Sequence, residues 1–118
     1  MQKEWIVEFC EEFENEFNGY PENVQDAIMA AAEVLQRDGP QLGQHHEEPI
    51  YNWSFADIKD LYLPTGDKIW EIFFYFDPNR MVILLTARGN LDAAENNLVH
   101  RITIANDRIN LFLKKRKV

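Results

Sequence analysis

The chain has 118 residues, of which 46% are hydrophobic and 13% are aromatic. This composition is typical of a folded protein, and the length suits one domain over residues 1–118 rather than two. No apolar run reaches the roughly 18 residues that would cross a bilayer, and the first residues show no secretory signal. A single cysteine, Cys10, excludes an internal disulfide. We therefore expect a cytoplasmic protein with no membrane partner.

The formal net charge of −8 is unevenly distributed along the chain. Residues 1–60 carry three basic and 14 acidic side chains, whereas residues 61–118 carry nine basic and six acidic ones. This asymmetry predicts two different faces, although a solvated acidic surface is the simplest explanation of the first half. General nucleic-acid binding is disfavoured because phosphates are bound through Lys and Arg, but a local basic patch could still bind RNA.

The first third of the chain predicts one strand and two helices. Trp5, Val7 and Phe9 alternate with polar or exposed positions, which indicates a strand. A short helix follows over Glu11–Phe17. Apolar residues at helical spacing then predict a longer helix over residues 21–37, which Gly39-Pro40 ends.

The rest of the chain predicts three strands and one helix. Aromatic and β-branched runs mark the strands, and Pro, Gly and Asp mark the turns between them. The expected strands are Phe55–Leu63, Ile69–Phe76 and Met81–Ala87, the turns are Pro64–Asp67 and Asp77–Arg80, and the last helix is Ala93–Lys115. This order predicts an α+β fold with an N-terminal strand, two helices, an antiparallel three-stranded meander and a C-terminal helix. We expect the helices on one face of a mostly antiparallel sheet.

Four places in the chain carry motifs that occur together in one protein family. They are the helix end Leu35-Gln36-Arg37-Asp38-Gly39, the strand start Ile58-Lys59-Asp60-Leu61, the hairpin with Trp70-Glu71-Ile72 and Phe74-Tyr75-Phe76-Asp77-Pro78-Asn79-Arg80, and the Leu84-Leu85 run before a helix with Ala105-Asn106-Asp107-Arg108. In this order and at this spacing, the chain resembles the RelE/ParE toxin superfamily, and within it the HigB branch.

This resemblance implies a RelE-like fold and a role in a type II toxin–antitoxin system. Toxins of the RelE/HigB branch cleave mRNA on the ribosome and are neutralised by a cognate antitoxin, whereas the ParE branch acts on DNA gyrase. The resemblance therefore implies a metal-independent, ribosome-dependent endoribonuclease (an mRNA interferase) with an antitoxin, the ribosome and mRNA as partners. We expect no nucleotide cofactor, because the chain has no Gly-rich phosphate loop.

Three positions that are usually basic in the family are not basic here. Tyr62 follows the Lys-Asp-Leu motif where relatives often have Arg, and Glu71 follows the hairpin Trp where Arg is usual. Asn90 stands in a loop that often holds Lys, although Arg88 beside it could compensate in part. The alternatives are thus a weakened ribonuclease, a non-catalytic RelE-fold module that binds an antitoxin or another protein, and, less favoured by the motifs, a ParE-like gyrase inhibitor.

Ribonuclease chemistry of this kind uses the 2′-hydroxyl as nucleophile. It needs a proton acceptor, a proton donor for the leaving oxygen and cations around the phosphoryl group, and it needs no metal. The resemblance makes Lys59 and Arg80 catalytic candidates, the strand end adds Arg88, and a neutral-range pKa adds His46. A paired strand lysine and a solvated arginine at a hairpin tip are the structural alternatives for Lys59 and Arg80.

Candidate RNA-binding residues complete the predicted site. They are Lys68, Tyr62, Lys114, Lys115 and Arg116. Tyr62 could stack on a base, and the basic tail could contact rRNA, acidic groups or the helix dipole. Glu71 could act as a base, but a surface position or a salt bridge with Arg88 across the hairpin is favoured. We expect no metal site, because the adjacent His45 and His46 rarely converge on one ion.

Overall fold

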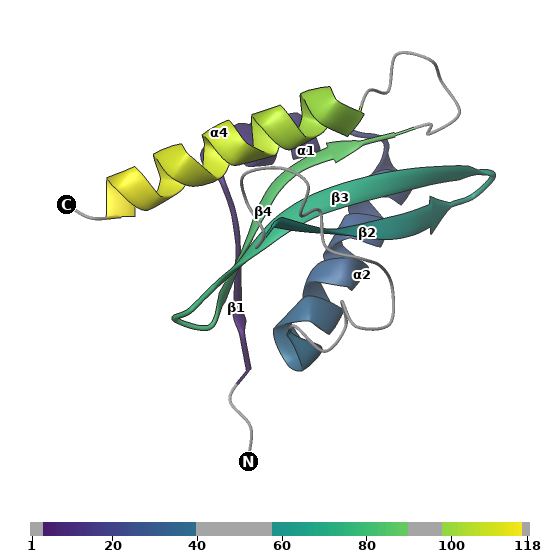
Figure 1. Cartoon of the computed structure of the whole chain (residues 1–118). Coiled ribbons are helices and arrows are strands. Elements are labelled where there is room, and N and C mark those ends of the chain that lie inside the picture. Colours follow the sequence, from purple (N-terminus) through teal and green to yellow (C-terminus); the bar gives the residue numbers. More distant parts are fainter. Residues whose placement is uncertain (1–3, 40–57, 90–97, 117–118) are drawn as a thin grey trace.

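A computed structural model describes residues 4–39, 58–89 and 98–116 of the chain (Figure 1). Its elements in chain order are β1 (Ile6–Phe9), α1 (Glu11–Phe17), α2 (Glu22–Asp38), β2 (Ile58–Thr65), β3 (Lys68–Asp77), β4 (Met81–Arg88) and α4 (Leu98–Arg116). The predicted α+β order is confirmed. The start of the predicted strand at Phe55 and of the predicted helix at Ala93 lie outside the described residues. Within these residues, no helix has the length and apolar character needed to span a membrane.

The four strands form one sheet in the order β1-β4-β3-β2. The meander from β2 to β4 is antiparallel, and β1 pairs with β4 in parallel. β2 continues through Pro64 and Thr65, which we had assigned to a turn, so that assignment is wrong. Pro64 fits because β2 is an edge strand, where a missing N–H breaks no ladder. Gly66 has a φ of +78° and begins the two-residue connection to β3.

Helices cover both faces of this sheet. Arg101 of α4 bonds the side chain of Thr86, and Phe112 and Leu113 share a pocket with Met81 and Ile83. Residues paired across strands lie on the same face, so these contacts define an α4 face. The opposite face lies against α2, where Lys68 and Trp70 of β3 line a pocket with Asn23 and Val24. We call it the α2 face. The prediction of helices on a single face is therefore wrong.

Strand β4 explains why two helical layers are needed. Its residues Val82 to Ala87 are all buried, without alternation. A continuously apolar strand is typical of a sheet that is covered on both sides. The α2 face buries Ile28 and Leu35 of α2, and the α4 face buries Ile109. Truncating one of these side chains to Ala would cost roughly 2–5 kcal/mol.

One glycine fixes the end of α2 against β1. Gly39 has a φ of +59°, and its N–H bonds the carbonyl of Leu35 to close the helix. A Cβ built on Gly39 would lie 2.4 Å from the indole nitrogen of Trp5. Both the left-handed backbone and the close approach of the ring therefore require glycine here.

Candidate functional site

Two oppositely charged side chains are buried together on the α4 face. Glu71 on β3 pairs directly with Arg88, the last residue of β4. The Nε of Arg88 donates to Oε1 of Glu71 at 2.7 Å, and the two side chains are only 12% and 2% exposed. The predicted salt bridge across the hairpin is therefore confirmed. The alternative of a surface position for Glu71 is wrong, because its side chain is only 2% exposed.

Tyr62 lies on the other side of Glu71. It pairs with Glu71 from β2, so Tyr62, Glu71 and Arg88 form one row across three strands. The Tyr62 side chain is 49% exposed. Partial burial raises the pKa of its hydroxyl, and the nearby Glu71 and Asp60 carboxylates raise it further, against the opposing effect of Arg88. We call this arrangement the Tyr62/Glu71/Arg88 row.

A second row adds a carboxylate and a cation beside the first. Asp60 pairs with Phe73, which pairs with Thr86. The Thr86 hydroxyl accepts a hydrogen bond from Arg101 of α4 at 3.2 Å. Our sequence reasoning did not group Asp60 with this site, although its spacing of two from Tyr62 places both on one face of a strand. Arg101 reaches Thr86 because of the way α4 packs against the sheet, and no local sequence pattern predicts this packing.

The other predicted catalytic residues lie away from the Tyr62/Glu71/Arg88 row. Lys59 pairs with Phe74, so it belongs to the α2 face. Arg80 lies at the tip of the β3–β4 hairpin, eight residues before Arg88, which is roughly 26 Å along an extended strand. Its guanidinium stands 5.2 Å from the centre of the Trp5 ring, and its φ is +64°. His46 lies outside the described residues.

Among the predicted RNA-binding residues, only Tyr62 lies in the same row as Arg88. Lys68 is exposed on the α2 face, where it lines a pocket with Asn23 and Trp70. The three residues of the basic tail lie at the far end of α4 from Arg101. Lys114 is exposed there.

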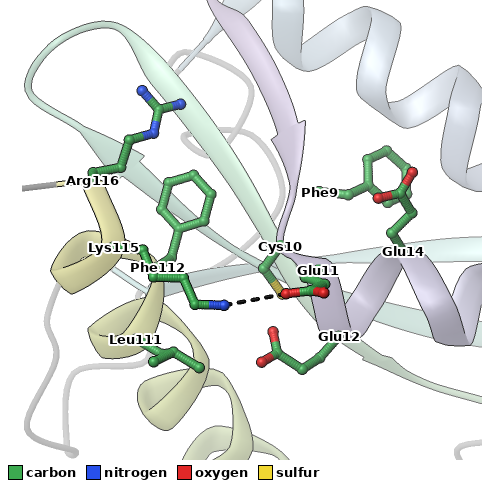
Figure 2. Close-up of a pocket in the computed structure, with 9 residues that line it drawn as sticks. All are labelled: Phe9, Cys10, Glu11, Glu12, Glu14, Leu111, Phe112, Lys115 and Arg116. Atoms are coloured by element: carbon green, nitrogen blue, oxygen red, sulfur yellow. Dashed lines mark hydrogen bonds and ion pairs between the residues drawn. The ribbon is translucent and has the colours of Figure 1, made fainter. Parts of the chain in front are cut away.

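The tail meets acidic residues of its own chain. Lys115 bonds Glu11 at 3.2 Å, and Figure 2 shows the two side chains facing each other beside Cys10, in a pocket of about 280 Å³. Arg116 pairs with Glu8. Of the alternatives for the tail, contact with acidic groups is thus observed within the molecule.

A more buried ion pair joins α4 to α1. Arg108 donates to both oxygens of Glu16, at 2.9 Å and 2.5 Å, and also to the carbonyl of Leu85 at 2.9 Å. The hydrogen-bonded Glu16 carboxylate raises the pKa of the Arg108 guanidinium against the opposing effect of burial. Leu85 lies at the irregularity of β4, where the register shifts opposite Phe73 and Phe74. Arg108 therefore binds a carbonyl of β4 at this irregularity.

No metal site is found in the part of the chain that the structure describes. Within residues 4–39, 58–89 and 98–116, no three His, Cys, Asp or Glu side chains are placed to hold an ion together. The candidate site therefore consists of Tyr62, Glu71 and Arg88, with Asp60, Thr86 and Arg101 in the adjoining row.

This fold is that of the RelE toxins. The structure of an E. coli toxin RelE mutant in the free state superposes with a TM-score of 0.63 at 13% sequence identity, over 90% of this chain and 98% of that one. Residues 15–88 match the family model described as "Phage derived protein Gp49-like (DUF891)", and the chain belongs to this family.

A curated relative carries the name of the predicted branch. The chain is 36% identical over 59 residues to a Mycobacterium tuberculosis protein named as a candidate toxin, HigB3. The match covers 50% of this chain and 50% of that protein, so the chain spans about half the length of the curated relative it matches. The resemblance to the RelE/HigB group that the motifs indicated is confirmed.

Proposed function

We propose that this protein is the toxin of a type II toxin–antitoxin pair and that it cleaves mRNA on the ribosome in the cytoplasm. The observation that carries this proposal is the Tyr62/Glu71/Arg88 row, in which a cation and a half-exposed aromatic ring flank Glu71 at the end of one sheet face. The name of the HigB3 relative and the RelE fold support it.

The row suits binding and cleavage of a phosphodiester. Arg88 would contact the reacting phosphate and stabilise the charge that develops on it, with Arg101 as a second cation nearby. Tyr62 would contact the nucleotide. Lys59, Lys68 and Arg80 lie elsewhere on the molecule, so with the tail residues Lys114, Lys115 and Arg116 they would contact ribosomal RNA instead of the reacting group. His46 stays a candidate acid or base.

A second candidate function is a non-catalytic binding module of the same fold. One observation favours it: Glu71 and Asp60 balance the charges of Arg88 and Arg101, so the two rows carry no net positive charge. A neutral surface attracts phosphates weakly compared with a basic one. In both candidates we propose a cognate antitoxin as protein partner, encoded by an adjacent small gene.

Inducible expression in bacteria separates these functions. We expect growth arrest and mRNA cleavage that stops when translation is blocked. Arg88→Ala should relieve the arrest, whereas Arg37→Ala, which removes an exposed arginine at the end of α2, should not. Lys59→Ala should have a smaller effect than Arg88→Ala, because it lies on the opposite face. Each variant is compared at equal soluble protein.

Two outcomes would contradict the proposed ribonuclease activity. Normal growth with intact mRNA at full soluble expression would favour the binding module. A DNA damage response without mRNA loss would favour gyrase as the target. Because Arg88→Ala leaves Glu71 unpaired in the interior, the double variant Arg88→Ala with Glu71→Ala should be tested beside it.

A further inference from the structure

An exposed apolar patch lies next to the candidate site, at the end of the α4 face where β2 turns into β3. Tyr62 and Pro64 are two residues apart on β2, so they lie on the same face of the sheet. Across the strand pair, Pro64 is paired with Ile69, and Tyr62 with Glu71. Tyr62 is 49% exposed, Ile69 is 48% exposed, and Pro64 is exposed as well. We call Tyr62, Pro64 and Ile69 the apolar patch.

The exposure of this patch is confined to one face and one end of β2. On the α4 face, Ile58 and Asp60 are buried, and the strand becomes exposed at Tyr62. On the α2 face, Leu61 and Leu63 are both buried. Helix α4 packs mainly on β4 and also contacts β3. The apolar patch therefore adds little to the core, and an exposed group of apolar side chains beside polar ones is typical of a binding surface.

The charges of the neighbouring row limit how an RNA could be held there. Arg88 is paired with Glu71 at 2.7 Å, and a second carboxylate, Asp60, is buried in the adjoining row. Because these carboxylates offset the arginine charge, attraction of phosphates alone would give weak binding. Stacking of a base on an aromatic ring needs no net charge, and it typically contributes roughly tenfold to 100-fold in affinity per base.

We propose that the apolar patch is a stacking platform for one of the two RNA bases that flank the reacting phosphate, an inference that rests on the proposed ribonuclease function. Tyr62 supplies the ring, and Pro64 and Ile69 extend its apolar surface. Arg88 lies two strands away in the same row, roughly 10 Å between Cα atoms at the usual strand spacing. An aromatic surface and a cation on one sheet face match the base and the phosphate of a single-stranded RNA.

A platform of this kind selects bases by size. Pro64 and Ile69 have no polar side-chain atoms, and Tyr62 offers a single hydroxyl. Such a surface distinguishes bases by the area that stacks, because it presents almost no donors or acceptors to the base edges. The two fused rings of a purine bury more area than the single ring of a pyrimidine. We therefore expect a purine to be favoured over a pyrimidine by about fivefold at this position, with adenine and guanine nearly equal.

The test uses purified protein and ribosomes loaded with a defined mRNA in which the cut has been mapped. Matched mRNAs lack the base on one side of the cut or on the other, and single-turnover cleavage is measured over a range of protein concentrations. For the wild type, removing the base on one of the two sides should raise the half-saturating concentration about tenfold or more, with a smaller change in the maximal rate. Tyr62→Ala should bind the intact mRNA more weakly and lose this dependence on the base. Tyr62→Phe should keep the dependence, because phenylalanine retains the ring.

A second exposed apolar residue provides the matched control. Met29 is 47% exposed but lies on α2, so Met29→Ala should behave like the wild type on every mRNA. If Tyr62→Ala depended on the base as the wild type does, or the wild type on neither base, the platform would be overturned. Cleavage by the wild type would then leave the proposed function standing, and the apolar patch would be assigned to a protein partner. A wild type that cleaves no mRNA would instead refute the proposed function, and the platform with it.

Discussion

At the scale of single residues, the Arg88 and Glu71 pair links stability to function. Both side chains are nearly buried, so each compensates for the desolvation of the other. Removing one partner leaves an uncompensated charge in the interior, which typically costs 3–5 kcal/mol, whereas removing both can be almost neutral. A loss of activity in a single variant therefore combines the loss of the side chain's function with the loss of stability. Only a double-variant cycle separates these two causes.

We expect a strong coupling in that cycle. Arg88→Ala and Glu71→Ala should each lower the free energy of unfolding by about 3 kcal/mol or more, and the double variant should lose much less than the sum. Urea unfolding of the four proteins measures this. Additive losses would mean that the pair contributes no interaction energy, and the buried position of Glu71 would then need another explanation.

The contact that the sequence predicted correctly is a local one, because the bond from Arg88 to Glu71 follows from their positions on a hairpin. The roles of Tyr62 and Arg88 in a site stay predictions. Lys59 was grouped with them because of a family motif. In a strand, however, residues three apart point to opposite faces, and the pairing of Lys59 with Phe74 puts it on the α2 face. A family motif indicates shared ancestry. The alternation of residues along a strand determines which face of the sheet each side chain occupies.

At the scale of elements, the position of α4 was the part that the sequence did not predict. Its apolar stripe indicates that one side is buried, but a stripe does not say against which face of a sheet. The continuous burial of β4 shows that the second face needs a cover. Contacts far apart in sequence, such as Arg108 with Glu16, then fix where the helix lies.

Arg108 should be the most important of the ionic contacts between α4 and the rest of the fold. Its side chain is 14% exposed and bonds both a carboxylate and a backbone carbonyl. We expect Arg108→Ala to cost about 1.5–3 kcal/mol or more, since the hydrogen bonds involve a charged group. Lys115→Ala removes an exposed pair and should cost at most about 1 kcal/mol. Equal losses for the two variants in urea unfolding would contradict this ranking.

At the scale of the whole molecule, the uneven charge along the chain is partly matched within the fold. The acidic half places Glu8, Glu11 and Glu16 where the basic half places Arg116, Lys115 and Arg108. Part of the charge asymmetry is thus neutralised within the molecule, because these ion pairs join the end of α4 to β1 and α1. The uneven charge alone predicted two unlike faces. The topology of the chain shows that acidic residues of the first half pair with basic residues of the second half.

The molecule should lose stability in alkaline solution. Burial, with a smaller contribution from Glu16, raises the pKa of Tyr20 to about 12 from its ordinary value near 10. Burial also raises the pKa of Cys10. A group whose pKa is raised by folding stabilises the protein fully below its unfolded pKa, and this contribution is lost as the pH rises through the folded value. The window is therefore pH 10 to about 12 for Tyr20.

Tyr20→Phe tests this directly, because phenylalanine keeps the ring that contacts Trp70 and cannot ionise. We expect the wild type to lose on the order of 2 kcal/mol more than Tyr20→Phe between pH 9 and 12, because folding raises the pKa of Tyr20 to about 12. Tyr62→Phe, whose ring is half exposed, should change the alkaline loss less. Urea unfolding at several pH values measures all three proteins. Parallel curves for wild type and Tyr20→Phe would show that Tyr20 ionises as freely in the folded chain as in the unfolded one.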